Sequence, residues 1–328
     1  MSIIMHSGSF LHSALLLLSL ATTAWTAVVL KEGPDKVRVE IAGTLFTEYC
    51  FTGAPHVYFY PLIGPSGAPM TRDWPMKDTP GEEHDHLHHR SLWFAHGSVN
   101  HLDFWTEVPA GKPLDKTHGR IEHTKFLEIK SGEKEGLIRD QLRWVAPDGS
   151  VPVTSVQTFR VQEGAERIID FTVTLTAGEK DVIFGDTKEG TMALRIAESM
   201  RLVGANKKPG EGKIVNSMGD TDAKAWGKKA AWVDYSGPVE GKTVGIAIFD
   251  HPKNPRHPTR WHARDYGLFA ANPFCEHDMD KTQPAGTGDF KLPAGQSVTF
   301  QYRIILHTGD APQAKIAEHF ALYGKTEK

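Results

Sequence analysis

Histidine residues are concentrated in one short stretch of this 328-residue chain. Residues 84–90 read His-Asp-His-Leu-His-His-Arg. The polar and aromatic residues that follow this stretch are His96, Asn100 and Trp105. In an extended segment His86 and His88 point to one side and His89 to the other, so they converge on one point only if the chain bends. Because imidazole transfers protons near neutral pH and binds metals, the stretch indicates proton-transfer or metal chemistry, with ordinary loop histidines as the alternative.

A second candidate group lies on a turn bounded by glycines. Residues 184–190 read Phe-Gly-Asp-Thr-Lys-Glu-Gly, and an apolar run that contains Arg195 follows. Glu189 stands beside Lys188, and a carboxylate in such a place can act as a general base whose pKa is set by its charged neighbours. A solvated, charged turn is the simpler interpretation of the same residues.

The third candidate region is a long loop, residues 250–274, in which four prolines are mixed with Arg, His and aromatic residues. It contains Trp261, His262, Arg264 and Asn272. Flat aromatic faces stack on the CH surfaces of sugars, while Arg, His and Asn side chains bond sugar hydroxyls. The loop therefore suits a polyhydroxylated ligand, and simple packing against the body of the protein is the alternative.

Several common chemistries are disfavoured by motifs that the sequence lacks. It has no glycine-rich nucleotide-binding motif, no Gly-x-Ser-x-Gly turn, no cysteine-based zinc pattern and no His-Glu-x-x-His segment. The net charge is −3 without a basic block, which argues against nucleic-acid and membrane-surface partners. The two cysteines, Cys50 and Cys275, either pair in an oxidising compartment or remain as two buried thiols.

The elements that position these groups are predicted to be strands. Apolar and polar residues alternate in several runs, and a period of two is typical of strands. The runs are residues 37–41, 151–155, 171–175, 244–248 and 298–306. Turn-forming residues at hairpin spacing predict an antiparallel meander over residues 119–178. Long strands with polar alternate positions favour an all-β fold, a large antiparallel β-sandwich.

One helix is predicted near the end of the chain, where it should cover a sheet face or edge. Asp310 can cap its first turn, and Gln313 occupies the capping-box position. Apolar residues then repeat on one face, and Gly324 is expected to end the helix.

The first residues resemble a secretory leader. The apolar run of residues 14–21 is far shorter than the ~20 residues that span a bilayer, and the small residues Thr22 and Ala24 follow it. We expect cleavage after Ala24, which leaves residues 25–328 as a single sandwich domain in the periplasm or outside the cell. An uncleaved N-terminal anchor is the alternative, because the basic residues usual at the start of a leader are missing.

Three of these stretches together resemble the bacterial PmoA-like family, often labelled "methane oxygenase PmoA". The resemblance is carried by residues 86–94 with 100–105, by residues 184–190 and by residues 261–274, and it spans most of residues 37–308. This chain has Leu87 where the family usually has Pro, and His101 where Gly is usual. No later segment is long enough to cross a bilayer, so the membrane-bound oxidation in the label is not expected.

Members of the PmoA-like family look similar to galactose-mutarotase-like sandwiches, in which a His acid and a carboxylate base act on a sugar in an open groove. The resemblance implies a carbohydrate-active protein that acts on a sugar or modified glycoside without a cofactor. His89 or His262 is the expected acid and Glu189 the expected base. The residues expected to hold the sugar are His86, His88, Arg90, Asn100, Trp105, Arg195, Trp261, Arg264 and Asn272. We expect His89 and Glu189 to approach one another across a groove rimmed by residues 257–272.

Other functions stay open at this point. Epimerisation, lyase elimination and hydrolysis all use a paired acid and base. A metalloenzyme is the second hypothesis, because imidazole suits Cu, Zn or Fe. Its expected ligands are His86, His88, His89 and His262. A non-catalytic glycan-binding protein is the third.

Overall fold

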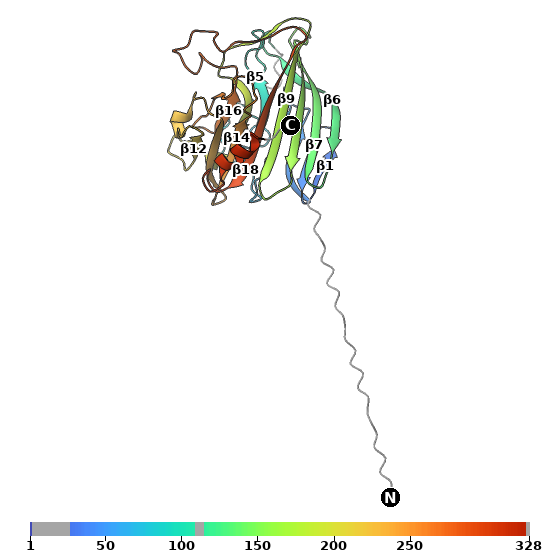
Figure 1. The fold of residues 1–328 in the computed structure, drawn as a ribbon, viewed down its shortest axis with the longest axis vertical. Helices are drawn as coiled ribbons and strands as arrows, with labels where there is room; N and C mark the ends of the chain where they lie inside the picture. The colour runs from blue at the N-terminus through green and yellow to red at the C-terminus, as the bar shows by residue number, and fades with distance from the viewer. Residues whose placement is uncertain (2–26, 109–114, 326–328) are drawn as a thin grey trace.

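The computed structural model describes Met1 and residues 27–108 and 115–325 (Figure 1). The predicted leader, residues 1–24, therefore lies outside the described residues apart from Met1. In the described part of the chain the strands form two eight-stranded sheets and one two-stranded sheet. The pairings between these strands are antiparallel.

The first sheet, called the N-terminal sheet, contains strands from both ends of the chain. Its spatial order is β1 (Val28–Glu32), β2 (Lys36–Ile41), β3 (Thr44–Cys50), β4 (Tyr58–Phe59), β5 (Leu92–His96), β11 (Gly190–Arg195), β16 (Leu268–Asn272) and β15 (Arg260–Trp261). The two-stranded sheet pairs β10 (Val182–Phe184) with β17 (Phe290–Leu292).

The second sheet, called the meander sheet, has longer strands. Its spatial order is β12 (Lys213–Asn216), β13 (Trp232–Val239), β14 (Lys242–Asp250), β18 (Ser297–Thr308), β9 (Arg167–Ala177), β8 (Val153–Gln162), β7 (Glu135–Val145) and β6 (Arg120–Lys130). Strands β6 to β9 are consecutive in the chain and adjacent in the sheet, which confirms the meander predicted for residues 119–178. Figure 1 shows these long strands running side by side.

The hydrophobic core lies between the two large sheets. Phe94 of β5 packs against Phe171 of β9 with ring centroids 5.8 Å apart, and Phe59 of β4 packs against Phe159 of β8 at 4.6 Å. All four rings are buried. Burying one such side chain contributes roughly 1.5–3 kcal/mol, so contacts of this kind hold the sheets together and place the strand ends that carry the polar groups.

The α-helix α1 (Ile316–Tyr323) covers part of the outer face of the meander sheet. The rings of Phe320 and Tyr323 pack against Phe249 of β14, with centroids 5.5 and 6.0 Å apart. This contact confirms that the predicted helix covers a sheet face.

The helix begins later than the capping box predicts. The reciprocal bonds are present, since the Gln313 N–H donates to Asp310 Oδ1 at 3.1 Å and the Asp310 N–H donates to Gln313 Oε1 at 3.0 Å. Lys315, however, has a φ of 53°, in the left-handed region that a right-handed helix cannot include. The capping box therefore closes a turn, and helical backbone starts only at Ile316.

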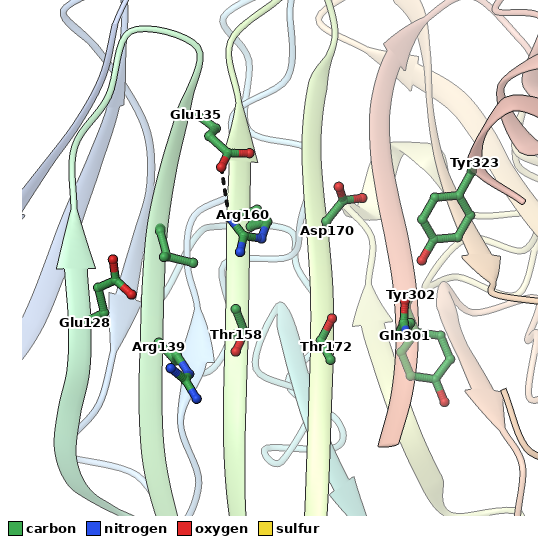
Figure 2. Close-up of a pocket in the computed structure, with 11 residues that line it drawn as sticks. Glu128, Glu135, Arg139, Thr158, Arg160, Asp170, Thr172, Gln301, Tyr302 and Tyr323 are labelled. Carbon is green, nitrogen blue, oxygen red and sulfur yellow. Dashed lines mark hydrogen bonds and ion pairs between the residues drawn. The ribbon is translucent and has the colours of Figure 1, made fainter. Parts of the chain in front are cut away.

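The rest of the meander sheet's outer face is polar. Arg139, Thr158, Thr172 and Gln301 lie in register on four adjacent strands, as Figure 2 shows. They line a pocket of about 580 Å³. This surface belongs to the sheet opposite the one that carries the predicted site residues.

These observations confirm the predicted all-β antiparallel sandwich with a C-terminal helix. Within residues 27–108 and 115–325, no helix is long and apolar enough to cross a membrane. Cys50 and Cys275 are both free. Burial raises the pKa of the Cys50 thiol to about 11 and that of Cys275 to about 12.

Candidate functional site

Three segments that are far apart in the chain meet at one end of β5, β11 and β16. Arg195 ends β11 and pairs with Leu268 at the start of β16. The backbone N–H of Arg195 donates to the carbonyl of Ser91, which directly precedes β5. The antiparallel register therefore brings the histidine-rich stretch to the end of β11 and to the loop before β16.

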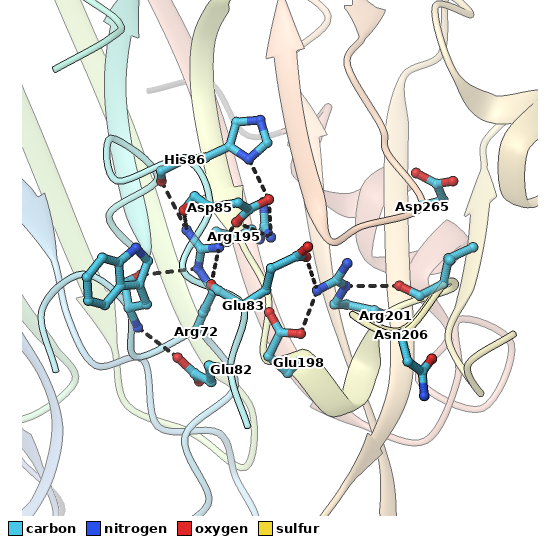
Figure 3. Close-up of polar contacts among 12 residues, drawn as sticks. Arg72, Glu82, Glu83, Asp85, His86, Arg195, Glu198, Arg201, Asn206 and Asp265 are labelled. Carbon is cyan, nitrogen blue, oxygen red and sulfur yellow. Dashed lines mark hydrogen bonds and ion pairs between the residues drawn. The ribbon is translucent and has the colours of Figure 1, made fainter. Parts of the chain in front are cut away.

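Two buried arginines share one carboxylate at this junction (Figure 3). Arg72 and Arg195 both donate to Oδ1 of Asp85. The bond from Nη2 of Arg195 is 3.1 Å long. Arg72 also donates to the carbonyl of His86 at 3.0 Å. Burial would raise the pKa of Asp85, but the hydrogen bond to His86 and the two guanidinium charges hold it well below its usual range. Asp85 is therefore ionised at neutral pH.

His86 is the solvent-facing member of this cluster. Its Nδ1 lies 2.5 Å from Oδ2 of Asp85, and 39% of its side chain is exposed. Its ring is nearly parallel to those of His89 and Tyr266, with centroids 4.6 and 5.2 Å away. An ionised carboxylate at Nδ1 favours the tautomer that carries its proton there, which leaves Nε2 as a proton acceptor. The geometry of His86 thus suits proton exchange with a bound molecule.

His89, in contrast, is enclosed. It is 1% exposed, its ring stacks on Trp93 at 5.4 Å, and Nη1 of Arg195 lies 3.1 Å from its Nδ1. Burial and then the neighbouring His88 and Arg195 lower the pKa of His89 well below its ordinary value. His89 is therefore a neutral acceptor for Arg195, and the predicted acid role would require the site to open.

Tyr266 links the histidine cluster to the loop before β16. The guanidinium carbons of Arg195 and Arg264 lie 4.8 and 5.2 Å from its ring centroid. Burial raises the pKa of Tyr266 to about 12, although both arginines act in the opposite direction. Two cations therefore converge on one half-buried aromatic ring.

Glu189 lies on the turn that leads into β11, as predicted. Its Oε1 accepts a hydrogen bond from Nζ of Lys188 at 2.7 Å, and 30% of its side chain is exposed. The charge of Glu189 contributes to the raised pKa of Tyr266, so the carboxylate is within electrostatic reach of that ring. In the described structure no hydrogen bond or ring contact joins Glu189 to His89, and Tyr266 is their shared neighbour.

His262, the other predicted acid, is also buried at 1% exposure. Its backbone exchanges two hydrogen bonds with Ala270 of β16. Among the described residues neither ring nitrogen has a hydrogen-bond partner. Burial, followed by the charges of Arg264 and Lys188, lowers the pKa of His262 to about 3, so its imidazole is neutral.

Three predicted sugar-binding residues lie beneath the histidine cluster. Arg90 donates to both carboxylate oxygens of Glu107, at 2.6 and 2.8 Å. The rings of His88 and Trp105 pack against His89 at 4.5 and 6.1 Å, and burial lowers the pKa of His88 to about 3. In this arrangement the three residues support the cluster.

Three others are engaged in contacts elsewhere. Trp261 is buried and its Nε1 donates to the carbonyl of Ala230 at 2.8 Å. Asn272 is also buried, and its amide donates to the carbonyl of Thr187 at 2.9 Å, which ties the Glu189 turn to β16. Asn100 follows the far end of β5 and accepts a bond from the backbone of β10. The structure does not bring these three side chains to the histidine cluster.

No metal centre is evident in the described ranges. Within residues 27–108 and 115–325, no group of three or more His, Cys, Asp or Glu side chains is arranged to hold a metal ion. Among the predicted ligands, Nδ1 of His86 faces Asp85, and Nδ1 of His89 faces Arg195.

Sequence reasoning assigned no role to three residues of the site. Asp85 lies inside the histidine-rich stretch, and its position next to His86 was the available signal. Tyr266 lies inside the third candidate loop, but the sequence does not distinguish it from the aromatic residues around it. Arg72 has no other candidate site residue near it in the chain, so only the tertiary structure reveals its contact with Asp85.

The fold and site define this protein as an antiparallel β-sandwich with a partly exposed Asp-His pair in the loop before β5. The chain matches the DUF6807 family, a family of unknown function, over residues 36–321, and it belongs to that family. The predicted membership of the PmoA-like family is therefore wrong. The three short motifs were enough to suggest a family, but they did not distinguish the PmoA-like family from DUF6807. No curated protein matches the sequence.

Several solved structures are similar to this chain at low identity. The α-galactosidase from Lactobacillus brevis is 7% identical, with a TM-score of 0.41, over 88% of this chain and 40% of that protein. A polysaccharide lyase is 12% identical, with a TM-score of 0.36, over 89% of this chain and 34% of the lyase. The galactose 1-epimerase from Lactobacillus acidophilus NCFM is 9% identical, with a TM-score of 0.39, over 86% and 98%. The chain thus spans less than half the length of the first two proteins.

Proposed function

We propose that this protein is an acid–base enzyme that acts on a sugar or modified glycoside beside Tyr266. The observation that carries the proposal is the Asp85–His86 pair, in which a carboxylate that is ionised at neutral pH orients a partly exposed imidazole. In the proposal His86, once its Nε2 has accepted a proton, takes the acid role that the sequence suggested for His89 or His262, because those two rings are buried.

The proton-transfer function of His86 follows from its two nitrogens. Nδ1 is engaged by Asp85, so a proton gained or lost in a reaction is exchanged at Nε2. The carboxylate stabilises the imidazolium that forms when Nε2 accepts a proton. Arg72 and Arg195 keep Asp85 in place and ionised, so it orients His86 and does not itself exchange protons.

Glu189 is the proposed second group. Its carboxylate is partly exposed and, like His86, lies near Tyr266. Its Oε1 pairs with Nζ of Lys188, and a carboxylate is a suitable general base. A base and an acid that border one surface can remove a proton from a sugar carbon or hydroxyl and return one elsewhere.

Aromatic and cationic side chains around the pair support a sugar as the substrate. Tyr266 and Trp226 are both half-buried aromatic residues. Such rings can stack on sugar CH faces, and Arg264 between them can bond hydroxyls. Epimerisation, elimination and hydrolysis all use two proton-transfer groups, which in this proposal are His86 and Glu189.

The test is turnover of a panel of sugars and 3-keto-glycosides by four variants. H86A and E189Q should each lower turnover by about 10²–10⁴-fold, the usual contribution of a general acid or base. The matched controls are H319A on α1 and E133Q in the β6–β7 turn, which should keep wild-type activity. Turnover that survives in both H86A and E189Q contradicts the proposal. Sugar binding without turnover in the wild type would favour a glycan-binding protein instead.

A further inference from the structure

The guanidinium group of Arg264 lies near two aromatic rings and has no acidic partner among the described residues. It is 5.2 Å from the ring centroid of Tyr266 and 5.9 Å from that of Trp226. Among the residues that the structure describes, no carboxylate forms an ion pair with it. Arg195, by contrast, is paired with Asp85.

The backbone around Arg264 holds this side chain in place. Its N–H donates to the carbonyl of Leu268 at 2.7 Å, and its own carbonyl accepts the N–H of Gly267 at 3.1 Å. Gly267 has a φ of 95°, which favours glycine and closes the turn tightly. A guanidinium held against aromatic rings keeps its N–H edges available, and this planar fork matches the two oxygens of a carboxylate.

The groups next to Arg264 would also favour an anion. His262 is buried, and both of its ring nitrogens lack partners among the described residues. Burial and then the charges of Arg264 and Lys188 lower the pKa of this imidazole, and they outweigh the opposing charge of Asp278. A neutral imidazole offers one N–H donor and one acceptor nitrogen to a bound molecule.

A pocket of about 310 Å³ adjoins this arginine. It is lined by Ala223, Trp226, Ala263, Arg264 and Asp265. The half-buried indole of Trp226 offers a flat wall, and the Asp265 carboxylate can accept hydroxyl hydrogen bonds. Trp226 can pack against a sugar ring, Asp265 can accept bonds from its hydroxyls, and the Arg264 guanidinium can bind a carboxylate. Together these groups match a sugar ring that carries a carboxylate.

We propose that Arg264 binds the carboxylate of an acidic sugar, so that the substrate class of this site is a saccharide that contains a uronic acid. This inference rests on the proposed function, because Arg264, which lines the pocket, lies against Tyr266, the ring on which His86 stacks. The carboxylate supplies the acidic partner that Arg264 lacks, while Trp226 packs against the sugar ring.

The test compares the affinities of D-glucuronate and D-galacturonate with those of D-glucose and D-galactose by calorimetry. Wild-type protein should bind each acid more tightly than its neutral counterpart, by about tenfold to a hundredfold for one charge-assisted contact. R264Q should abolish that preference, because it lowers the affinity for the acids far more than that for the neutral sugars, and R264K should restore part of it. R139Q, which removes the same charge from the meander sheet, is the control and should behave as wild type. Added salt should weaken binding of the acids alone.

Equal affinity for the acidic and neutral sugars, or a preference that survives in R264Q, overturns the inference. Failure of the proposed enzyme gives a different pattern. If H86A abolishes turnover of a neutral glycoside and the wild type binds uronates no more tightly than neutral sugars, the enzyme proposal stands and the acidic-sugar inference fails. If uronates bind through Arg264 but no sugar is turned over, the inference stands and the enzyme proposal fails. Thermal melting of each variant shows whether it is folded.

Discussion

His307 of β18 and Asp234 of β13 form a buried pair across the strand that separates them. Nε2 of His307 lies 2.6 Å from Oδ2 of Asp234. The strand between them is β14, and Gly245 lies directly beside His307 in the register. A Cβ at position 245 would come within 2.3 Å of the imidazole, so the missing side chain makes room for the pair.

This pair should make stability depend on pH. Nδ1 of His307 faces the carbonyl of Thr308 at 3.3 Å, so both ring nitrogens face acceptors. Burial opposes the imidazolium, but the hydrogen bond and charge of Asp234 outweigh it and raise the pKa of His307. The stabilisation is therefore complete below the ordinary pKa of histidine, about 6.5, and is lost as pH rises through the folded value.

We expect the melting temperature to fall as the pH rises above about 6.5, with a loss of roughly 1.5–3 kcal/mol, the value of a hydrogen bond to a charged group. H307Q should be less stable at pH 6 and should show a flatter profile. Melting curves of both proteins across this range test the expectation, and an identical slope in the two proteins would contradict it.

Asp85 should be essential for stability as well as for orienting His86. D85N would leave Arg72 and Arg195, which are both fully buried, without their shared negative charge. Removing one partner of a buried ion pair costs roughly 3–5 kcal/mol. Because the pKa of Asp85 is lowered in the folded state, its contribution should be present at neutral pH and lost on acidification. Denaturant unfolding of D85N, with the exposed D78N as control, measures the cost, and equal losses would refute the role.

Gly97 should control the position of Glu189. Its N–H donates to the Glu189 carbonyl at 2.7 Å, and an added Cβ would lie 2.8 Å from the Cβ of Glu189. Real Cβ atoms do not approach so closely, so G97A must displace the carboxylate. We expect kcat to fall by at least about tenfold, because small misplacements of catalytic groups are costly. G204A, whose added Cβ meets only the Asn206 side chain within 3.4 Å, should keep its kcat.

The protein is predicted to be exported, because a short apolar run ends in small residues at the start of the chain. Expression of the full-length chain with cell fractionation and N-terminal sequencing tests this. We expect a mature protein that begins at Trp25 outside the cytoplasm. Full-length protein retained in the cytoplasm would contradict the prediction.

The strands were predictable because each large sheet has one face in the core. In β8, for example, burial alternates along the strand, and the sequence shows the same period of two. The start of α1 was not predictable from its capping box, because the backbone of Lys315 depends on how the preceding turn closes. Residue propensities and the spacing of apolar residues determine where helices and strands lie, while the residues at which they begin and end depend on tertiary contacts.

The regions of the site were predicted more successfully than the roles of its residues. The histidine-rich stretch and the loop before β16 do meet, but His89 is enclosed there while His86 is exposed. The backbone bends at His86, whose φ of 41° lies in the left-handed region, and this bend decides which histidine is accessible. The extended conformation considered from the sequence does not include this bend. The sequence around Trp261 did not indicate that the indole N–H would donate to the carbonyl of Ala230 inside the protein.

The polar outer face of the meander sheet offers a means of attaching the protein to a surface with its site outward. Thr154 is exposed on that face, and the candidate site lies on the other sheet. Because burial raises the pKa of the Cys50 and Cys275 thiols, a cysteine introduced by T154C should react with maleimide much faster than either. Label coupled at position 154 would attach the protein to a sensor chip through the meander sheet, so that the sheet whose strand ends carry the candidate site is not the attached one.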